Sequence, residues 1–541
     1  MATTDKNGAS DFAIDLDNED GLTPPNFETL LNIEDFNERI VGGYNTGTGE
    51  QGLPADLTVA RSLMAPGSGA LRDFSYIAPE IPEFIPENCV GCMDCVTECP
   101  DTAILGKIAT QEELDKLLAK TTDPDQKEYL RKQFVETAKY HKNFEKKGKE
   151  GAYFGIFIDP TKCKGCAECV EVCSDKDALK MIDKTPENLE EYRSGWKFYN
   201  DLPESPPEYL IEKSVQDMML AEKSLLYVGG AGSCMGCGEA TALRMMLAAT
   251  GFIHGPDNVG LVASTGCNTV YTSTYPYNPY TIPWTNSLFE NGPTDAMGVR
   301  ARWDQMGWQD KKLWVIGGDG AMLDIGFQAL SRMMMSGMDI NVIVLDTQVY
   351  SNTGGQASTA TFTGQNAKMS VHGSAIPGKT ERRKELGQIC MMHPDVFVAQ
   401  TICTLPNHFY RAIVAANAYK GPSVISVYTT CQPEHGVGDH MAAHQAKLAM
   451  ESRAFPIFIY DPTQGERIKE RLSLRGNPAV NDDWYTVRKT GETVDFIQFA
   501  RTEGRFSKHF DEDGNASEAL LLGQEDRLKN WQMLQELAGI I

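Results

Sequence analysis

The sequence predicts an α/β protein in which a parallel sheet is joined to a smaller α+β domain built around cysteines. Over residues 207–462, apolar runs of strand length alternate with helix-length segments, which is typical of a parallel sheet covered on both faces. Over residues 81–206, the run C-x2-C-x2-C-x3-C occurs twice. Residues 1–80 show little periodicity, and we expect an extended arm or linker, or disorder, there. The charged residues 463–541 are expected to form a tail that contacts another subunit.

Composition narrows the function classes. The chain has 541 residues, enough for two to four domains, with 74 acidic against 50 basic residues and a formal charge of −24. Nucleic acid is therefore disfavoured as a partner. The N-terminus lacks the basic and apolar regions of a secretory signal, and no run of 18 apolar residues occurs. We expect a cytoplasmic protein without a membrane span, and the reducing cytoplasm suits clustered cysteines.

The two cysteine runs have the spacing of a bacterial two-cluster ferredoxin. In that arrangement each cluster is bound by the first three cysteines of one run and by the fourth cysteine of the other run. Two [4Fe–4S] ligand sets are expected: Cys89, Cys92, Cys95 and Cys173, and Cys163, Cys166, Cys169 and Cys99. Disulfides and structural zinc are the alternatives, but zinc sites use paired C-x2-C units. Between the runs, the lysine- and glutamate-rich insert Gln111–Lys149 is interpreted as helices with a solvated face and not as a binding patch.

The second half supplies the expected strands and helices. Predicted strands are Val259–Ala263, Leu313–Ile316, Ile340–Leu345 and Ser423–Tyr428, and predicted helices are Ile325–Ser336, Asn407–Ala418 and Glu525–Leu537. Four further cysteines, Cys234, Cys237, Cys267 and Cys431, lie in this half, the last two just beyond predicted strands. Loops at the carboxyl ends of strands converge in open α/β sheets, so a third cluster is possible; small buried hydrophobes are the equal alternative. Cys390 and Cys403 are expected to be packing residues.

A glycine-rich turn in this half predicts a cofactor site. Gly317-Gly318-Asp319-Gly320 follows one predicted strand, and Asp346-Thr347 ends the next. Both strand ends lie at the same edge of the sheet, so Asp319 and Thr347 can meet at a hard cation. Mg²⁺ takes oxygen ligands and is usually completed by phosphates, which glycines allow to approach the backbone. This is the logic of a thiamine diphosphate site, although the generic signature has Asn near the position of Thr347.

Several motifs together resemble the pyruvate:ferredoxin oxidoreductase family. They are GGDGAMLDIGFQAL, LDTQVYSNTGGQAS, SCMGCGE, STGCNT, WTNSLFENG, IPEFIPENCVGC and FIYDP. The resemblance runs from about Ile81 to Pro462. It implies a ferredoxin domain and a thiamine diphosphate-binding domain, and it assigns the four scattered cysteines to a third [4Fe–4S] cluster.

The resemblance also implies individual site residues. Mg²⁺ would be bound by Asp319, Thr347 and the carbonyl of Val349. The residues expected to line the cofactor are Glu239, Cys267, Gly318, Asp319, Gly320, Ala321, Thr347, Val349, Tyr350, Ser351 and Asn352. Asn352 would lie near the reacting carbon as a catalytic residue, although an Asn before Thr353-Gly354-Gly355 also suits a turn. His435 and His440 are given no catalytic role.

The implied reaction converts a 2-oxoacid, coenzyme A and oxidised ferredoxin or flavodoxin to acyl-CoA, carbon dioxide and reduced carrier. Pyruvate is favoured by the run Tyr350–Thr353; 2-oxoglutarate or a branched-chain 2-oxoacid is the alternative. An electron-transfer-only subunit is the rival from another class. No pyrimidine-binding domain with its activating glutamate is recognised, so a larger subunit carrying it, in an α2β2 complex, is expected.

Overall fold

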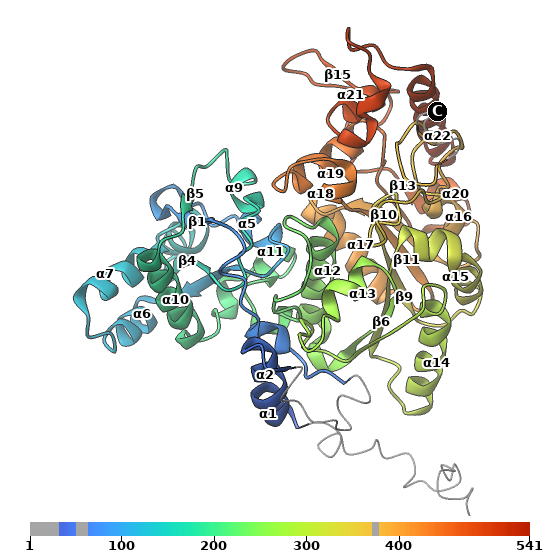
Figure 1. Cartoon of the computed structure of the whole chain (residues 1–541). Helices are drawn as coiled ribbons and strands as arrows, with labels where there is room; N and C mark the ends of the chain where they lie inside the picture. Colours follow the sequence, from blue (N-terminus) through green and yellow to red (C-terminus); the bar gives the residue numbers. More distant parts are fainter. Residues whose placement is uncertain (1–31, 50–62, 371–377) are drawn as a thin grey trace, which may run out of the picture.

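A large, mostly parallel sheet organises the second half of the chain (Figure 1). The computed structural model describes residues 32–49, 63–370 and 378–541, so expectations for the rest of the arm lie outside the described residues. The sheet has the order β13-β12-β10-β11-β9-β8-β6-β7. Its strands are β6 (Val259–Ser264), β7 (Trp284–Ser287), β8 (Lys312–Gly318), β9 (Asn341–Asp346), β10 (Phe397–Ile402), β11 (Ser423–Tyr428), β12 (Phe458–Tyr460) and β13 (Leu472–Ser473).

The pairing confirms the expected α/β class. Strands β10, β11, β9, β8, β6 and β7 pair in parallel, whereas β12 and β13 are antiparallel additions at one edge. The four predicted strands correspond to β6, β8, β9 and β11. Short connections through helices place the ends of these parallel strands, and hence their loops, at one edge of the sheet.

Helices cover both faces of the sheet, as its uninterrupted apolar strands require. They are α12 (Gly238–His254), α13 (Cys267–Thr272), α14 (Gly292–Gln305), α15 (Phe327–Met334), α16 (Leu386–Met391), α17 (Pro406–Ala418), α18 (Gln432–His435) and α19 (Ala442–Glu451). Alternate residues of β8 enter different cores: Trp314 packs in the core that includes α12 and α17, and Val315 in the core that includes α15. The predicted helix Ile325–Ser336 is shorter, because a π-helical turn over Gly320–Ile325 precedes α15.

The first cysteine-rich part forms a separate α+β lobe. Strands β1 (Glu80–Phe84) and β5 (Leu179–Asp183) form an antiparallel pair, and β2 (Ile104–Ala109), β4 (Tyr153–Ile158) and β3 (Phe134–Val135) form a second small sheet. The helices are α5 (Asp94–Thr97), α6 (Gln111–Leu118), α7 (Pro124–Lys132), α8 (Asn143–Glu145), α9 (Glu168–Glu171), α10 (Pro186–Asp201) and α11 (Val215–Met218), with a π-helical turn at Ala138–Lys142. The insert 111–149 is therefore not purely helical, since β3 pairs with β4.

Two contacts anchor this lobe on the α/β domain. The Arg244 guanidinium, on α12, donates to the carbonyl oxygens of Cys99 (3.1 Å) and Val96. The Lys164 ammonium donates to the carbonyl oxygen of Ser233 at 2.8 Å and pairs with Asp101 at 2.6 Å. The three charged side chains, Arg244, Lys164 and Asp101, are all buried, so the two lobes share one polar, desolvated interface.

The segments expected to reach other subunits pack on their own chain. In residues 463–541, β13 extends the sheet, and α21 (Phe496–Arg501) and α22 (Glu518–Leu537) bury Phe499 and Trp531 in the cores of the α/β domain. In the described part of the arm, Phe36 packs edge-on against Tyr275 with ring centroids 6.2 Å apart. Within the described ranges, no helix has the length and apolar character needed to cross a membrane.

Candidate functional site

A pocket at the carboxyl edge of the parallel strands gathers the predicted cofactor residues. Cys267 follows β6, Gly318–Ala321 follow β8, Thr347–Asn352 follow β9, and Glu239 lies in the first turn of α12. All the residues that the sequence assigned to the cofactor line this one pocket, together with Thr265, Gly266, Phe289 and Thr353, which it did not assign.

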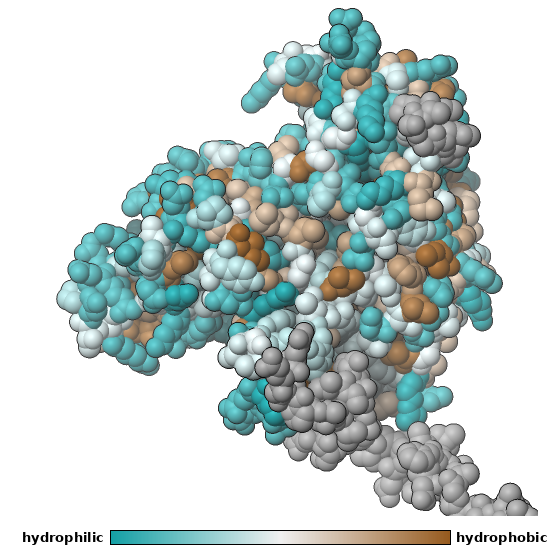
Figure 2. Space-filling view, viewed as in Figure 1, coloured by the Kyte–Doolittle hydropathy of each residue, from teal (hydrophilic) through white to brown (hydrophobic). Residues whose placement is uncertain are grey.

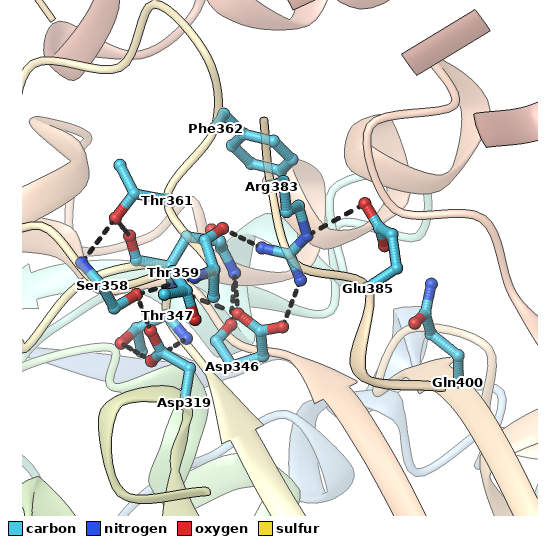
Figure 3. Close-up of polar contacts among 12 residues, drawn as sticks. Asp319, Asp346, Thr347, Ser358, Thr359, Thr361, Phe362, Arg383, Glu385 and Gln400 are labelled. Carbon is cyan, nitrogen blue, oxygen red and sulfur yellow. Dashed lines mark hydrogen bonds and ion pairs between the residues drawn. The ribbon is translucent and has the colours of Figure 1, made fainter. Parts of the chain in front are cut away.

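Asp319 and Thr347, two of the predicted cation ligands, lie side by side (Figure 3), and with Val349 they line the pocket. Asp319 Oδ1 accepts from the Thr347 hydroxyl at 3.2 Å and from the Thr347 backbone N–H at 3.3 Å. The same hydroxyl lies 3.2 Å from the Val349 carbonyl oxygen and 2.6 Å from Ser351 Oγ. A carboxylate, a hydroxyl and a carbonyl thus share one small volume, and these are the ligand types that Mg²⁺ takes.

The Asp319 carboxyl is electrostatically costly without a cation. It is 1% exposed. Burial, followed by the neighbouring Asp346 carboxylate, raises its pKa to about 8. Asp346 is neutralised by the Arg383 guanidinium, and Ser358 Oγ donates to Asp319 Oδ2 at 2.5 Å (Figure 3). Arg383 therefore serves Asp346, and a bound cation would supply the positive charge that Asp319 lacks.

A second buried acid faces the same pocket. Glu239 is 5% exposed, and among the described residues its Oε2 has no hydrogen-bond partner. Burial and then repulsion from Asp319 raise its pKa to about 8. An unpartnered buried carboxyl is expensive, so a bound polar group is the natural partner for this oxygen.

At Gly320 the absence of a side chain leaves the backbone open to a bound group. A Cβ at Gly320 would collide with the ring of Tyr350, whose hydroxyl donates to Asp324 Oδ2 at 2.9 Å. Only glycine fits this turn while Tyr350 stays in place. Asn352 lies at the exposed rim, in a turn closed by Gly355 N–H and the Tyr350 carbonyl at 3.0 Å. The turn-forming interpretation of Asn352 thus accounts for its local geometry.

The structure brings the cysteines together in the predicted groupings. One cavity is lined by Cys89, Cys92, Cys95 and Cys173, and another by Cys99, Cys163, Cys166 and Cys169. In the part of the chain that is described, no three His, Cys, Asp or Glu side chains are close enough to hold a single metal ion. Burial raises the pKa of Cys89 to about 11 and of Cys163 to about 12, so bare thiolates are not favoured there.

The scattered cysteines form a third group beside the cofactor pocket. After burial and the carboxyl of Glu239, repulsion from Cys237, Cys431 and Cys234 raises the pKa of Cys267, which places the four sulfurs within electrostatic range of one another. Cys267 also lines the pocket. The sequence expectation that Cys390 and Cys403 are packing residues stays a prediction; both are buried in the apolar cores.

Two residues behind the site were not predicted from the sequence. Ser358 ends the motif LDTQVYSNTGGQAS but was given no role, and Arg383 lies in a later loop without a recognisable motif. His435, given no catalytic role, is a buried link: the Cys431 backbone N–H donates to its Nδ1 at 3.4 Å, which leaves Nε2 to donate to the Thr347 carbonyl at 2.9 Å. Burial lowers the pKa of His435, consistent with this neutral tautomer.

Comparison with known proteins agrees with this geometry. The family profile of the thiamine pyrophosphate enzyme C-terminal TPP binding domain matches residues 264–427. Residues 264–427 are therefore similar to a thiamine pyrophosphate-binding domain. The matched range contains β8, β9 and the loop after β6, and hence the loops that hold Cys267, Asp319 and Thr347.

Relatives confirm the resemblance to the pyruvate:ferredoxin and pyruvate-flavodoxin oxidoreductases. The probable pyruvate-flavodoxin oxidoreductase of Escherichia coli (strain K12) is 29% identical over 474 residues, covering 74% of this chain and 38% of that protein. The pyruvate:ferredoxin oxidoreductase of Moorella thermoacetica is 27% identical over 527 residues, covering 82% and 41%. The chain spans about two fifths of the length of these relatives. A solved 2-oxoglutarate:ferredoxin oxidoreductase from Magnetococcus marinus aligns over 38% of this chain and 65% of that one, at 20% identity and a TM-score of 0.33.

Proposed function

We propose that this chain binds thiamine diphosphate with Mg²⁺ and three [4Fe–4S] clusters, and that it serves a CoA-acylating 2-oxoacid oxidoreductase. The observation that carries the proposal is the position of Cys267, which lines the cofactor pocket and also belongs to the third cysteine group. A redox centre held there would touch the organic cofactor. Pockets for thiamine diphosphate in non-redox enzymes need no such neighbour, so this contact supports oxidation coupled to electron transfer.

The residues of the pocket have separate tasks. Asp319, Thr347 and the Val349 carbonyl would hold Mg²⁺, and Gly320 would leave room for the diphosphate. When bound, thiamine diphosphate supplies the electron sink for cleaving a 2-oxoacid next to its carboxylate, and the clusters supply one-electron acceptors. Glu239, protonated at neutral pH by its raised pKa, can donate a hydrogen bond from its carboxyl to the bound group. Asn352, at the rim, would orient the substrate carbonyl.

The chain's own contacts order the three cysteine groups. Lys164, in the loop of the second group, donates to the Ser233 carbonyl beside Cys234 of the third group. Cys99 of the second group lies in the same lobe as the four cysteines of the first group. Electrons would leave the cofactor through the third group, pass to the second, and exit through the first.

Substrate and assembly are the finer parts of the proposal. We propose pyruvate, because the names of several relatives specify pyruvate; 2-oxoglutarate and branched-chain 2-oxoacids are the alternatives. Acceptors would be ferredoxin or flavodoxin, as those names specify. We also propose that a larger subunit in an α2β2 complex adds the pyrimidine-side domain, its activating glutamate and the coenzyme A elements. A cytoplasmic location agrees with the clusters' need for reducing conditions.

Anaerobic purification with any associated polypeptide tests the proposal. Iron and acid-labile sulfide should each approach about twelve per chain, as three clusters require. Pyruvate with coenzyme A should bleach the cluster absorbance and reduce methyl viologen, and 2-oxoglutarate should do so more slowly. Full cluster content with no thiamine diphosphate binding would instead support the electron-transfer-only function. Mass spectrometry of the associated polypeptide tests the larger subunit.

A further inference from the structure

A lysine-rich segment, residues 138–150, packs against the loop of the first cysteine group. The ring of Tyr140, in this segment, lies so close to Gly91 that a Cβ placed on this glycine would be 2.9 Å from the ring. The Lys139 ammonium lies 3.5 Å from the Gly91 carbonyl oxygen. Gly91 stands between Cys89 and Cys92, so the segment touches the peptide that carries two of the cluster ligands. From the sequence this stretch was interpreted as a solvated helical face, since only the fold brings it close to the cysteine loop.

The segment is fixed in place and not a loose loop. The Tyr140 hydroxyl donates to Asp217 Oδ1 at 3.0 Å, and the ammonium of Lys139 pairs with the same carboxylate. Ala152 N–H donates to the Tyr140 carbonyl at 3.0 Å, which joins the end of the segment to its start. Tyr140 also stacks on Phe154 of β4, with ring centroids 5.3 Å apart. Its charges therefore keep a fixed position relative to the first cysteine group.

The charge of the segment opposes that of the molecule. The whole chain has a formal charge of −24, yet residues 138–150 hold five lysines and two glutamates. The lysines that are exposed and form no ion pair with any described residue are Lys142, Lys146, Lys147 and Lys149. One of the two glutamates, Glu145, is engaged by His141 at 3.5 Å. The lobe presents a mostly hydrophilic face in Figure 2.

An apolar side chain completes the surface. Val90, the neighbour of Cys89, is 50% exposed and lines the cavity of the first cysteine group. Lys176 lies on the same cavity wall, where it pairs with Asp175 at 2.8 Å and Asp94 at 3.8 Å. Transient complexes between electron-transfer proteins bury small interfaces, and complementary charge steers their association.

We propose that Val90 and the lysines of residues 138–150 form the docking surface for an acidic one-electron carrier protein. The inference rests on the proposed function, because it assumes that electrons leave through the first cysteine group. Charge complementarity selects the occupant: a small acidic protein can align its negative face with this patch alone. A long polyanion such as nucleic acid would also meet the surrounding acidic surface, which repels it.

The test reverses the charge of three exposed lysines and compares the effect with that of an equal charge reversal elsewhere on the chain. The docking variant carries Lys142→Glu, Lys146→Glu and Lys147→Glu. The control carries Arg475→Glu, Arg488→Glu and Lys489→Glu, three exposed residues of the C-terminal region far from the cysteine lobe (Figure 1). Both lower the net charge equally. The probes are a purified acidic flavodoxin and a purified two-cluster ferredoxin, mixed with the anaerobic holoprotein; binding is measured by calorimetry and reduction by stopped flow.

We expect the docking variant to raise the dissociation constant and the KM for carrier about ten- to a hundredfold at low salt, with the gap closing as salt increases. The control should stay within about twofold of the parent protein. Equal carrier binding by both variants overturns the docking surface, and so does lysine-dependent binding of duplex DNA or phosphatidylserine vesicles in place of the carriers. Methyl viologen reduction measures the proposed function separately. If the parent protein does not reduce methyl viologen, the proposed function is wrong, and carrier binding still tests the docking surface.

Discussion

Asp319→Asn is the substitution that most directly tests the cation site. Asparagine has nearly the same shape and retains an oxygen that can accept from the Thr347 hydroxyl, so packing should be preserved. What changes is the charge offered to Mg²⁺. At about 4 Å and an effective dielectric constant of about 20, two unit charges attract by about 4 kcal/mol. Since about 1.4 kcal/mol is a tenfold change in affinity, we expect Mg²⁺-dependent thiamine diphosphate binding to weaken about a hundred- to a thousandfold.

The cation-free protein should respond in the opposite sense. Its Asp319 pKa, raised to about 8 by burial and by Asp346, exceeds the ordinary value of 3.8. The unfolded chain therefore releases this proton near pH 4 while the folded chain keeps it to about pH 8, so folded stability falls as pH rises through that window. The loss at pH 7 is on the order of 4 kcal/mol. Asparagine removes it, so the cation-free variant should unfold at a higher temperature at pH 7 than its parent.

Calorimetric titration and thermal unfolding, with and without Mg²⁺ and thiamine diphosphate, measure both effects. Asp310→Asn is the matched control, because Asp310 precedes β8 whereas Asp319 follows it, so the same charge is removed at the opposite end of one strand. Iron content is determined in parallel, since the cysteine groups should retain their clusters. Undiminished cofactor affinity in Asp319→Asn, or equal losses in both variants, would refute the assignment of Asp319 to the cation.

Three further outcomes are expected. Cys431→Ser should lower iron from about twelve to about eight per chain and leave the signals of the other clusters, whereas unchanged iron would exclude Cys431 as a ligand. Arg244→Met should destabilise the chain in urea by about 3 kcal/mol, because carbonyls that bind the guanidinium lose a charged donor; an unchanged midpoint would contradict this. Burial lowers the pKa of His408 to about 4. As pH falls, the unfolded state therefore binds this proton at a higher pH than the folded state does. The free energy of unfolding should drop by about 2 kcal/mol from pH 7 to pH 5. His408→Gln should flatten this slope in calorimetry and the exposed His440→Gln should not; equal slopes would argue against a role for His408.

Local patterns were sufficient for the strands and the loops at their ends. Strands β6, β8, β9 and β11 are uninterrupted apolar runs buried on both faces, and such runs are visible in a sequence. Because consecutive parallel strands deliver their loops to one edge, Asp319 and Thr347 were predictably close. The first two cysteine groupings followed from spacing, whereas the third was implied only by the family resemblance.

Long-range polar contacts could not be predicted from the sequence. The pairing of Asp346 with Arg383 crosses 37 positions, and neither residue belongs to a periodic pattern. The packing of the C-terminal region was hidden for a related reason: Trp531 and Arg527 of α22 lie in a helix that is charged overall, yet both are buried, with Arg527 paired to Glu385 at 2.7 Å. Buried, paired charges look like solvent-exposed ones in a composition, so the sequence did not show that this helix packs on its own chain, and its contact with another subunit stays a prediction.

The same region reaches the back of the loop that holds Thr347, and His435 joins that loop to the third cysteine group. Arg505 donates to Gln348 Oε1 at 2.9 Å, and Gln348 stands next to Thr347 in the chain. From the other side, His435 bridges the backbone of Cys431 to the carbonyl of Thr347. A displacement of the Cys431 loop would therefore be transmitted through one rigid imidazole to a residue that faces the cation. Arg505, in the region expected to contact another subunit, thus also supports the loop that holds Thr347 from within its own chain.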